Sequence, residues 1–309
     1  MCIRDRYIRL VRIIGGNNVL LLADQWKDYE LIDMGNGEKL ERWGNYVLRR
    51  PDPQVVWPME AEWSLWKNPH GHYHRSNKGG GQWEHKKKYP EQWTISYKDL
   101  KFHIKPTGFK HTGLFPEQAA NWEWSMDKIR NAKRPIKVLN LFAYTGGATV
   151  ACAAAGAAEV CHVDASKGMT TQAKENIKLS GLEDRKVRFI VDDVVKFVER
   201  EIRRGNKYDA IIMDPPSYGR GPKGEVWQIE EKLFDFVNLC MKVLSDKPLF
   251  FLINSYTTGF SPIVLENVLQ TTIGKKVKGG KIYGGELGIP ASRDGKILPC
   301  GIFGRWESK

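Results

Sequence analysis

VLNLFAYTGG (residues 138–147) joins an apolar segment to a glycine pair, and an alanine-rich segment follows it. We predict a strand, a tight turn and a helix, the arrangement found at the first strand of a doubly wound sheet. Glycine lets the backbone bend sharply and approach a ligand closely, because it has no Cβ. The stretch therefore favours a site for a cofactor that contains a nucleoside.

This turn differs from the turns that bind phosphate groups. It lacks the third glycine of Gly-x-Gly-x-x-Gly, and the chain has no Gly-Lys-Ser/Thr segment. Both patterns serve phosphates held on a helix N-terminus. S-adenosylmethionine (SAM) fits better than a dinucleotide or a nucleoside triphosphate, since it carries adenine and ribose but no phosphate.

Two further apolar segments end in carboxylates. Asp164 ends the segment 160–164 and stands 18 residues after Gly146, where a carboxylate accepts hydrogen bonds from both ribose hydroxyls. Asp192 and Asp193 end the segment 187–191, and we expect them to accept a hydrogen bond from the adenine amino group. Three strand ends in this order strengthen the prediction of a SAM site.

The sequence DPPSY (residues 214–218) follows a fourth apolar segment, 208–213. Two prolines fix φ and lack N–H groups, so this turn offers acceptors only: the Asp214 carboxylate and the proline carbonyls. Tyr218 is available to stack on the face of a planar base. The turn therefore predicts a site for a base that carries N–H groups.

From about Thr107 to the C-terminus, the chain resembles the bacterial class I SAM-dependent methyltransferases of large-subunit ribosomal RNA, a family that includes cytosine-C5 and guanine-N7 enzymes of 23S rRNA. The resemblance implies an α/β fold with a Rossmann-like, mostly parallel sheet and a C-terminal antiparallel hairpin. It also implies SAM as cofactor and RNA as partner. The motifs that carry it are NLFAYTGG (140–147), HVDAS (162–166), VDDV (191–194), DPPSY (214–218) and NSYTTG (254–259).

The resemblance extends to individual site residues. The catalytic set is Asp214, Pro215, Pro216 and Tyr218. The cofactor-binding set is Phe115, Gln118, Asn140, Phe142, Tyr144, Thr145, Gly146, Asp164, Ala165, Asp192, Asp193 and Asp214. The first two come from a segment, 110–118, similar to the family's loop over the methionine end of SAM. Asn140 stands where many methyltransferases have an acidic residue.

Methylation of cytosine C5 requires a cysteine nucleophile, so the atom that receives the methyl group depends on whether the site contains one. Ser255 occupies the position where the cytosine-C5 enzymes carry a cysteine nucleophile, and a hydroxyl without an adjacent base is weakly nucleophilic. Cys240 lies in a predicted helix and Cys300 in the predicted terminal hairpin. We therefore favour a nitrogen of the base, with guanine first, over cytosine C5. The base, atom and RNA position stay open.

Composition agrees with a cytoplasmic enzyme that acts on nucleic acid. The 309 residues carry a net charge of +12, which suggests a polyanionic partner. The five cysteines form no Cys-x-x-Cys pair, and their odd number fits a protein of a reducing compartment. Cys152, Cys161 and Cys240 have apolar neighbours, and we expect them to be buried. No segment reaches the ~18 consecutive apolar residues that a membrane span needs. The sequence does not decide whether the protein forms a homodimer. Residues 1–6 resemble translated adapter sequence, so we expect the native start to be missing.

We predict two domains: residues 7–105, β-rich, basic and rich in tryptophan, and the methyltransferase domain, residues 106–309. Nine of eleven tryptophans fall at or before Trp124, and residues 67–110 contain ten Lys/Arg against three Asp/Glu. Cations and aromatic rings together are typical of RNA binding. A small sheet with tryptophans in its core and solvated lysines explains the composition equally well.

Several elements follow from hydrophobic periodicity and turn residues. Hairpins are expected over 29–43 and 93–105, and a terminal one over 279–304. Strands and helices alternate between the second and third hairpins. The strands are expected near 136–141, 159–164, 187–191, 208–213 and 248–253, and the helices near 147–156, 167–180, 193–204 and 228–244. We expect residues 219–224, with three glycines and two cations, to form a lid.

His70, His72 and His74 have a spacing that suits a metal, yet no cysteine or carboxylate lies nearby in the sequence. We favour a polar loop or an RNA-facing surface there and expect no metal site.

Two other function classes stay open. A SAM-dependent methyltransferase of a protein or a small molecule would share every motif of the cofactor site. An RNA-binding protein without turnover is less favoured, because every motif residue except Asn140 fits a working enzyme.

Overall fold

The computed structural model describes residues 11–13, 19–60, 63–76, 80–108, 110–221 and 223–309. The predicted adapter segment lies outside them. The chain divides into two compact units. The first unit comprises Met1–Leu21, Ala120–Leu287 and Gly301–Lys309, and the second comprises Leu22–Ala119 and Gly288–Cys300. The functional assignments of residues 7–105 and 106–309 stay predictions.

The first unit is built on five parallel strands whose apolar residues the sequence marks clearly. Their order in the sheet is β12-β11-β10-β13-β16, so β10 and β13 meet where the order reverses. These strands confirm the five predicted ones: β10 (Lys137–Leu141), β11 (Glu159–Asp164), β12 (Val187–Val191), β13 (Ala210–Met213) and β16 (Phe250–Ser255).

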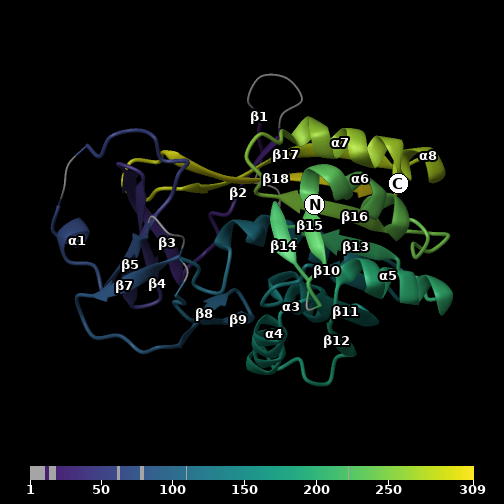
Figure 1. Ribbon diagram of the computed structural model, residues 1–309, viewed down its shortest axis with the longest axis horizontal. Helices are drawn as coiled ribbons and strands as arrows, with labels where there is room; N and C mark the ends of the chain where they lie inside the picture. Colours follow the sequence, from purple (N-terminus) through teal and green to yellow (C-terminus); the bar gives the residue numbers. More distant parts are fainter. Residues whose placement is uncertain (1–10, 14–18, 61–62, 77–79, 109, 222) are drawn as a thin grey trace, which may run out of the picture. The chain divides into compact units, whose positions relative to one another are not determined.

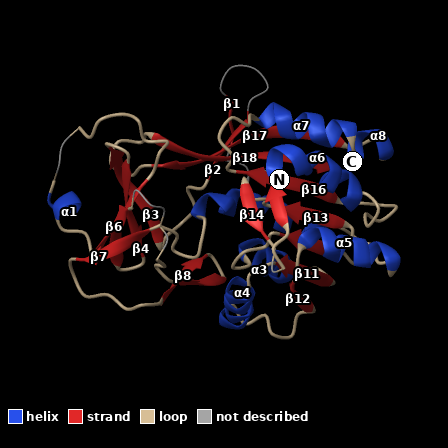
Figure 2. Ribbon diagram, viewed as in Figure 1, coloured by secondary structure: helices blue, strands red, loops and turns tan. Residues whose placement is uncertain are grey.

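Helices cover both faces of this sheet (Figure 2). Side chains alternate between the two faces of a strand, and the odd-numbered residues Leu139, Leu141 and Ile211 join a buried cluster with α5, α6 and α7. The even-numbered residues Asn140 and His162 lie on the opposite face of the sheet, where both contact Thr149 of α3. The helices of the unit are α2 (Ala119–Asn131), α3 (Gly147–Ala154), α4 (Lys167–Leu179), α5 (Val194–Arg203), α6 (Ile229–Cys240), α7 (Pro262–Thr271) and α8 (Ile273–Lys276).

The C-terminal strands complete the sheet as predicted. Strand β18 (Ile297–Glu307) runs antiparallel to β16, and β17 (Lys281–Pro290) pairs with it on the outer side. Strands β2 (Val19–Leu22) and β1 (Val11–Ile13) follow, giving nine strands (Figure 1). Within the described residues, no helix is long and apolar enough to cross a membrane.

The second unit is mostly β-structure. Two predicted hairpins are confirmed: β3 with β4, whose turn places Asn36 and Gly37 at φ 53° and 76°, and β8 with β9. A five-stranded sheet has the order β3-β4-β5-β6-β7. The elements are β3 (Tyr29–Gly35), β4 (Glu38–Trp43), β5 (Tyr46–Pro51), α1 (Ser64–Lys67), β6 (Gly71–Arg75), β7 (Gly81–His85), β8 (Trp93–Tyr97), β9 (Leu100–Ile104) and η1 (Pro116–Gln118).

The tryptophans of the second unit belong to its core. Trp43 and Trp66 are fully buried, and the others described there are half-buried. Five indole N–H groups donate to partners inside the unit, those of Trp26, Trp63, Trp66, Trp83 and Trp93; that of Trp66, for example, donates to Asp33 Oδ2 at 2.9 Å. The sequence allowed two roles for these tryptophans, RNA binding or core packing, and their burial favours core packing. The exposed Lys86, Lys87 and Lys88 remain candidates for phosphate contacts.

Candidate functional site

The carboxyl ends of the parallel strands bring the predicted motifs to one edge of the sheet. In open α/β sheets this edge, at the point where strand order reverses, is where ligands bind. Residues 142–147 follow β10, residues 164–166 follow β11, and Asp192 and Asp193 follow β12. The Asp-Pro-Pro turn follows β13. These segments define the candidate site.

The turn after β10 holds three residues in the left-handed region. Phe142 and Tyr144 have φ of 54° and 50°, which non-glycine residues rarely adopt, and Gly146 has 82°. The Phe142 ring packs edge-on against Trp227, with centroids 4.8 Å apart. Such strain persists where the surroundings fix it, and it clusters at ligand sites.

Asp164 fixes this turn. Its Oδ2 accepts the Tyr144 N–H at 2.8 Å, and its Oδ1 accepts the Ser166 N–H at 2.8 Å. Burial raises the pKa of the carboxyl, against the effect of these two hydrogen bonds. Each carboxylate oxygen keeps a lone pair, so Asp164 can still accept hydrogen bonds from two hydroxyls. Ala165, between these two contacts, is half-buried.

The glycine pair is required by close neighbours. A Cβ on Gly146 would lie 2.8 Å from the Cβ of Ala173, and one on Gly147 would lie 2.5 Å from Trp122 Cζ2. Both distances are shorter than real Cβ contacts. The second glycine therefore serves the packing of Trp122 on the start of α3, a reason that the sequence did not reveal.

A buried polar network lies beneath the turn. Asn140 Nδ2 donates to Thr149 Oγ1 at 2.9 Å, and Thr149 Oγ1 lies 2.9 Å from His162 Nδ1. Burial lowers the pKa of His162 to about 3, so its ring is neutral. Asn176 Nδ2 donates to the Thr145 carbonyl at 2.9 Å. The network shows Asn140 bonded inside the protein; direct contact with a cofactor stays a prediction. Sequence reasoning assigned no role to Thr149, His162 or Asn176, because they are ordinary polar residues of helices and a strand.

The two carboxylates after β12 have different partners. Asp192 Oδ1 accepts the Asp193 N–H at 2.9 Å, and Oδ2 pairs with Arg200. Asp193 is the N-cap of α5, where its Oδ1 accepts the Lys196 N–H at 3.0 Å. Both residues therefore hold the start of α5 in addition to any part in binding.

The Asp-Pro-Pro turn is anchored on both sides. The Pro216 carbonyl accepts the Trp227 Nε1–H at 2.7 Å, and Ser217 Oγ lies 2.7 Å from Thr257 Oγ1. The Pro216 carbonyl is thus engaged within the protein, and the acceptor role of Asp214 and the Pro215 carbonyl stays a prediction. Tyr218 exposes 55% of its surface, and its stacking on a ligand stays a prediction.

The predicted lid, residues 219–224, includes position 222, which lies outside the described residues, and its role as a lid stays a prediction. Strand β14 (Tyr218–Arg220) pairs with β15 (Val226–Gln228) as a short antiparallel hairpin. The Gly221 N–H donates to the Glu225 carbonyl at 2.8 Å, and Lys196 pairs with the Glu225 carboxylate. The hairpin is missed because three glycines mask two short strands.

The residues considered for a covalent mechanism are poor nucleophiles. Ser255 is 1% exposed, and its Oγ accepts the Thr257 N–H at 3.2 Å. Cys240 is fully buried on α6, and burial raises the pKa of its thiol well above the usual value. Cys300 belongs to the second unit, where burial, and then Glu117, raises its thiol pKa. Cys152, Cys161 and Cys240 are buried, as predicted.

Phe115 and Gln118 belong to the second unit. Phe115 precedes η1, and its carbonyl accepts the Gln118 N–H at 3.1 Å. Gln118 is buried. Their contact with the cofactor stays a prediction.

Comparisons with known proteins agree with this geometry. The family described as S-adenosylmethionine-dependent methyltransferase matches residues 67–234. The crystal structure of the SAM-dependent methyltransferase from Agrobacterium tumefaciens shares 38% sequence identity and a TM-score of 0.89, and the match covers 98% of this chain and 99% of that chain.

Curated relatives modify ribosomal RNA, according to their names. Ribosomal RNA large subunit methyltransferase K/L of Shewanella frigidimarina is 34% identical over 146 residues, 47% of this chain and 20% of the relative. Ribosomal RNA large subunit methyltransferase K of Neisseria meningitidis is 28% identical over 201 residues, 64% of this chain and 56% of the relative. The match thus spans less than two thirds of either relative.

We expect Gly147→Ala to lower the free energy of unfolding by about 1–3 kcal/mol, because the added methyl group meets the Trp122 ring. Urea unfolding measures it. The matched control is Gly168→Ala near the start of α4, where the nearest heavy atom, Ser166 Oγ, is 3.9 Å from the added carbon. Trp122→Leu should restore part of the loss in the double variant. Equal stability of the two alanine variants would contradict the packing account.

Proposed function

Because the chain belongs to the S-adenosylmethionine-dependent methyltransferase family, we propose that it transfers a methyl group from SAM to a base of large-subunit ribosomal RNA. One observation carries the proposal: Asp164 ends β11 and the Asp-Pro-Pro turn follows β13, and these two strands are the neighbours of β10 on its two sides. Cofactor and acceptor residues therefore share one edge of the sheet.

The residues present fit SAM. Asp164 keeps acceptor capacity for the two ribose hydroxyls, and Asp192 or Asp193 can accept the adenine amino group. The turn after β10, in which Phe142, Tyr144 and Gly146 have positive φ, also contributes Thr145, and we assign these four residues to the cofactor. When bound, SAM supplies an electrophilic sulfonium methyl group.

The chain's own residues then position the acceptor. Asp214 and the Pro215 carbonyl accept N–H bonds from an exocyclic amine, or Asp214 orients a guanine whose N7 lone pair is already available. The exposed Tyr218 ring stacks on the base, which has to leave its own stack to reach the site. Holding a lone pair in line with the methyl group is the main task of such an enzyme.

The names of the relatives and the charge of the chain support RNA as the substrate. A net charge of +12 favours a polyanion, and the second unit offers three consecutive exposed lysines, Lys86, Lys87 and Lys88. Action on ribosomal RNA would take place in the cytoplasm. A protein or small-molecule acceptor is the alternative, and it would use the same cofactor residues.

A nitrogen acceptor fits better than cytosine C5. Carbon 5 becomes nucleophilic only after a thiolate adds to the base, and the thiol pKa is raised in both buried Cys240 and half-buried Cys300. Ser255, at the position expected for the nucleophile, is buried and already bonded to the Thr257 N–H.

We expect Asp164→Ala to weaken SAM binding by about 1–3 kcal/mol, the scale of buried charge-assisted hydrogen bonds. Titration calorimetry measures it. Asp184→Ala, which removes a carboxylate whose side chain is 78% exposed, is the control and should bind SAM like the wild type. Unchanged affinity in Asp164→Ala would refute the assignment of Asp164.

Asp214→Ala should reduce methyl transfer to RNA by about 10²-fold or more while SAM affinity stays near the wild-type value, because Asp214 faces the acceptor. Tyr218→Ala should cost about 1–3 kcal/mol in the use of RNA, and Tyr218→Phe should keep the ring and most of the activity. Transfer of labelled methyl groups to ribosomal RNA provides the rates. If Asp214→Ala methylates RNA at the wild-type rate, the acceptor site lies elsewhere.

RNA that contains 5-fluorocytidine should form no denaturation-resistant complex with the protein, because no thiolate adds to the base. Fluorine at C5 blocks the elimination that would release such an adduct, so a C5 enzyme would be trapped. Gel electrophoresis under denaturing conditions detects the complex. A complex that disappears in Cys240→Ala or Cys300→Ala would restore the cytosine interpretation.

A further inference from the structure

Two histidines and a glutamate gather on one face of the sheet in the second unit. His72 and His74 lie two residues apart on β6 and so point to the same face. Glu84 stands directly opposite His72 on β7. The expectation of a polar loop without a carboxylate is therefore wrong: the segment is a strand, and the carboxylate arrives from the neighbouring strand.

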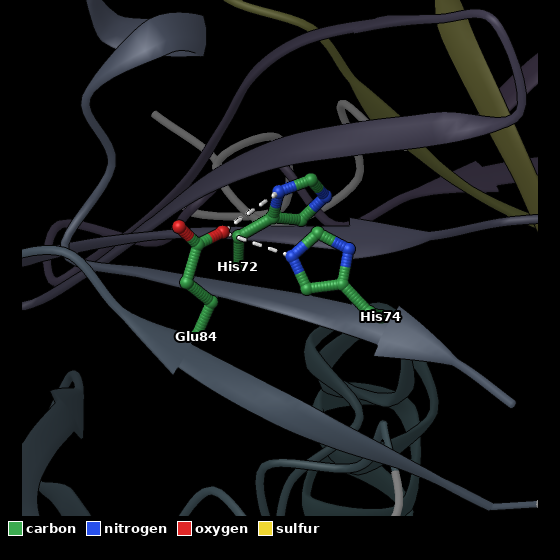
Figure 3. A group of neighbouring side chains, drawn as sticks. All are labelled: His72, His74 and Glu84. Carbon is green, nitrogen blue, oxygen red and sulfur yellow. Dashed lines mark hydrogen bonds and ion pairs between the residues drawn. The ribbon is translucent and has the colours of Figure 1, made fainter.

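The three side chains converge on a small volume (Figure 3). Each offers one ligand atom, and these atoms lie within 4.8 Å of one another. Glu84 Oε2 is 2.9 Å from His74 Nε2 and 3.9 Å from His72 Nδ1. Donors bound to one tetrahedral Zn²⁺ at about 2.0–2.1 Å stand about 3.3 Å apart. His74 and Glu84, half exposed, have room for the adjustment of less than about 1 Å that these two pairs need.

Glu38 orients the buried histidine. His72 Nε2 lies 2.7 Å from Glu38 Oε1, and Arg49 pairs with the other Glu38 oxygen. The hydrogen bonds from His72 and Arg49 lower the pKa of the Glu38 carboxyl, although burial alone would raise it. This contact fixes the orientation of the ring and leaves Nδ1 on the side of Glu84. Metal-binding histidines are commonly oriented by a carboxylate in this way.

His72 Nδ1 and Glu84 Oε2, 3.9 Å apart, face each other across the place where a cation would lie. Lys86 does not take that place, since its Nζ is 3.9 Å from the other Glu84 oxygen, Oε1. Two imidazole nitrogens and one carboxylate oxygen are the ligand types that zinc prefers.

We propose that His72, His74 and Glu84 bind one divalent zinc-class ion, with Glu38 as the positioning residue and a fourth position open to water. The ion joins β6 to β7, the edge strand of the five-stranded sheet, by a coordinate bond from each strand. It thereby stabilises the strand that precedes the exposed lysines Lys86, Lys87 and Lys88. This role is independent of methyl transfer.

Zinc titration of the full-length chain tests the proposal. The chain is purified without a histidine tag, stripped with a chelator and titrated by calorimetry, and its melting temperature is measured with and without zinc. We expect one Zn²⁺ per chain, a melting temperature that rises with zinc concentration, and binding at least ~10-fold weaker in His74→Ala and in Glu84→Gln. Both side chains are about half exposed, so these variants should fold. Glu38→Gln should lose about 10–100-fold.

His85→Ala is the matched control. His85 is an exposed histidine next to Glu84 on β7 that faces the other side of the sheet, and its removal should leave zinc affinity unchanged. With Co²⁺ in place of Zn²⁺, the visible absorption of the bound ion should appear in the wild type and in His85→Ala but not in His74→Ala. Equal zinc affinity of the wild type and His74→Ala, or equal losses in His74→Ala and His85→Ala, would overturn the proposal.

Discussion

The hydrogen bond from the Tyr144 N–H to the Asp164 carboxylate is the constraint on which the candidate site depends. It ties the end of β11 to the turn after β10 and holds two non-glycine residues at positive φ. The same carboxylate fixes Ser166, the N-cap of α4. Beneath it, the network of Asn140, Thr149 and His162 supports the start of α3. A preorganised backbone of this kind binds a ligand without the cost of ordering the loop first.

Much of this could be predicted from the sequence. The parallel strands have continuous apolar segments, because helices cover both of their faces, and each ends in a motif with its own chemistry. The positions of Asp164 and of the Asp-Pro-Pro turn, each at a strand end, therefore follow from the sequence. The hairpins of the second unit follow from their turn residues. The buried cysteines followed from their apolar neighbours.

What the sequence did not predict involves residues that meet across long separations. Glu84 reaches His72 through the pairing of β6 with β7, and Glu38 reaches it from β4 by a side-chain bond across 34 residues. Trp122 explains Gly147 only once α2 packs beside α3. The hairpin of β14 and β15 was hidden by glycines, which weaken strand propensity while leaving pairing possible. Local patterns carry no information on such partners.

The central claim is that this edge of the sheet transfers methyl groups to a nitrogen of a base in RNA. The direct measurement is a reaction of the wild-type chain with isotopically labelled SAM and large-subunit ribosomal RNA transcribed in vitro, followed by digestion and nucleoside mass spectrometry. The account predicts label in a single N-methylated nucleoside. Label that appears only in protein or metabolite fractions, or in 5-methylcytidine, would contradict it.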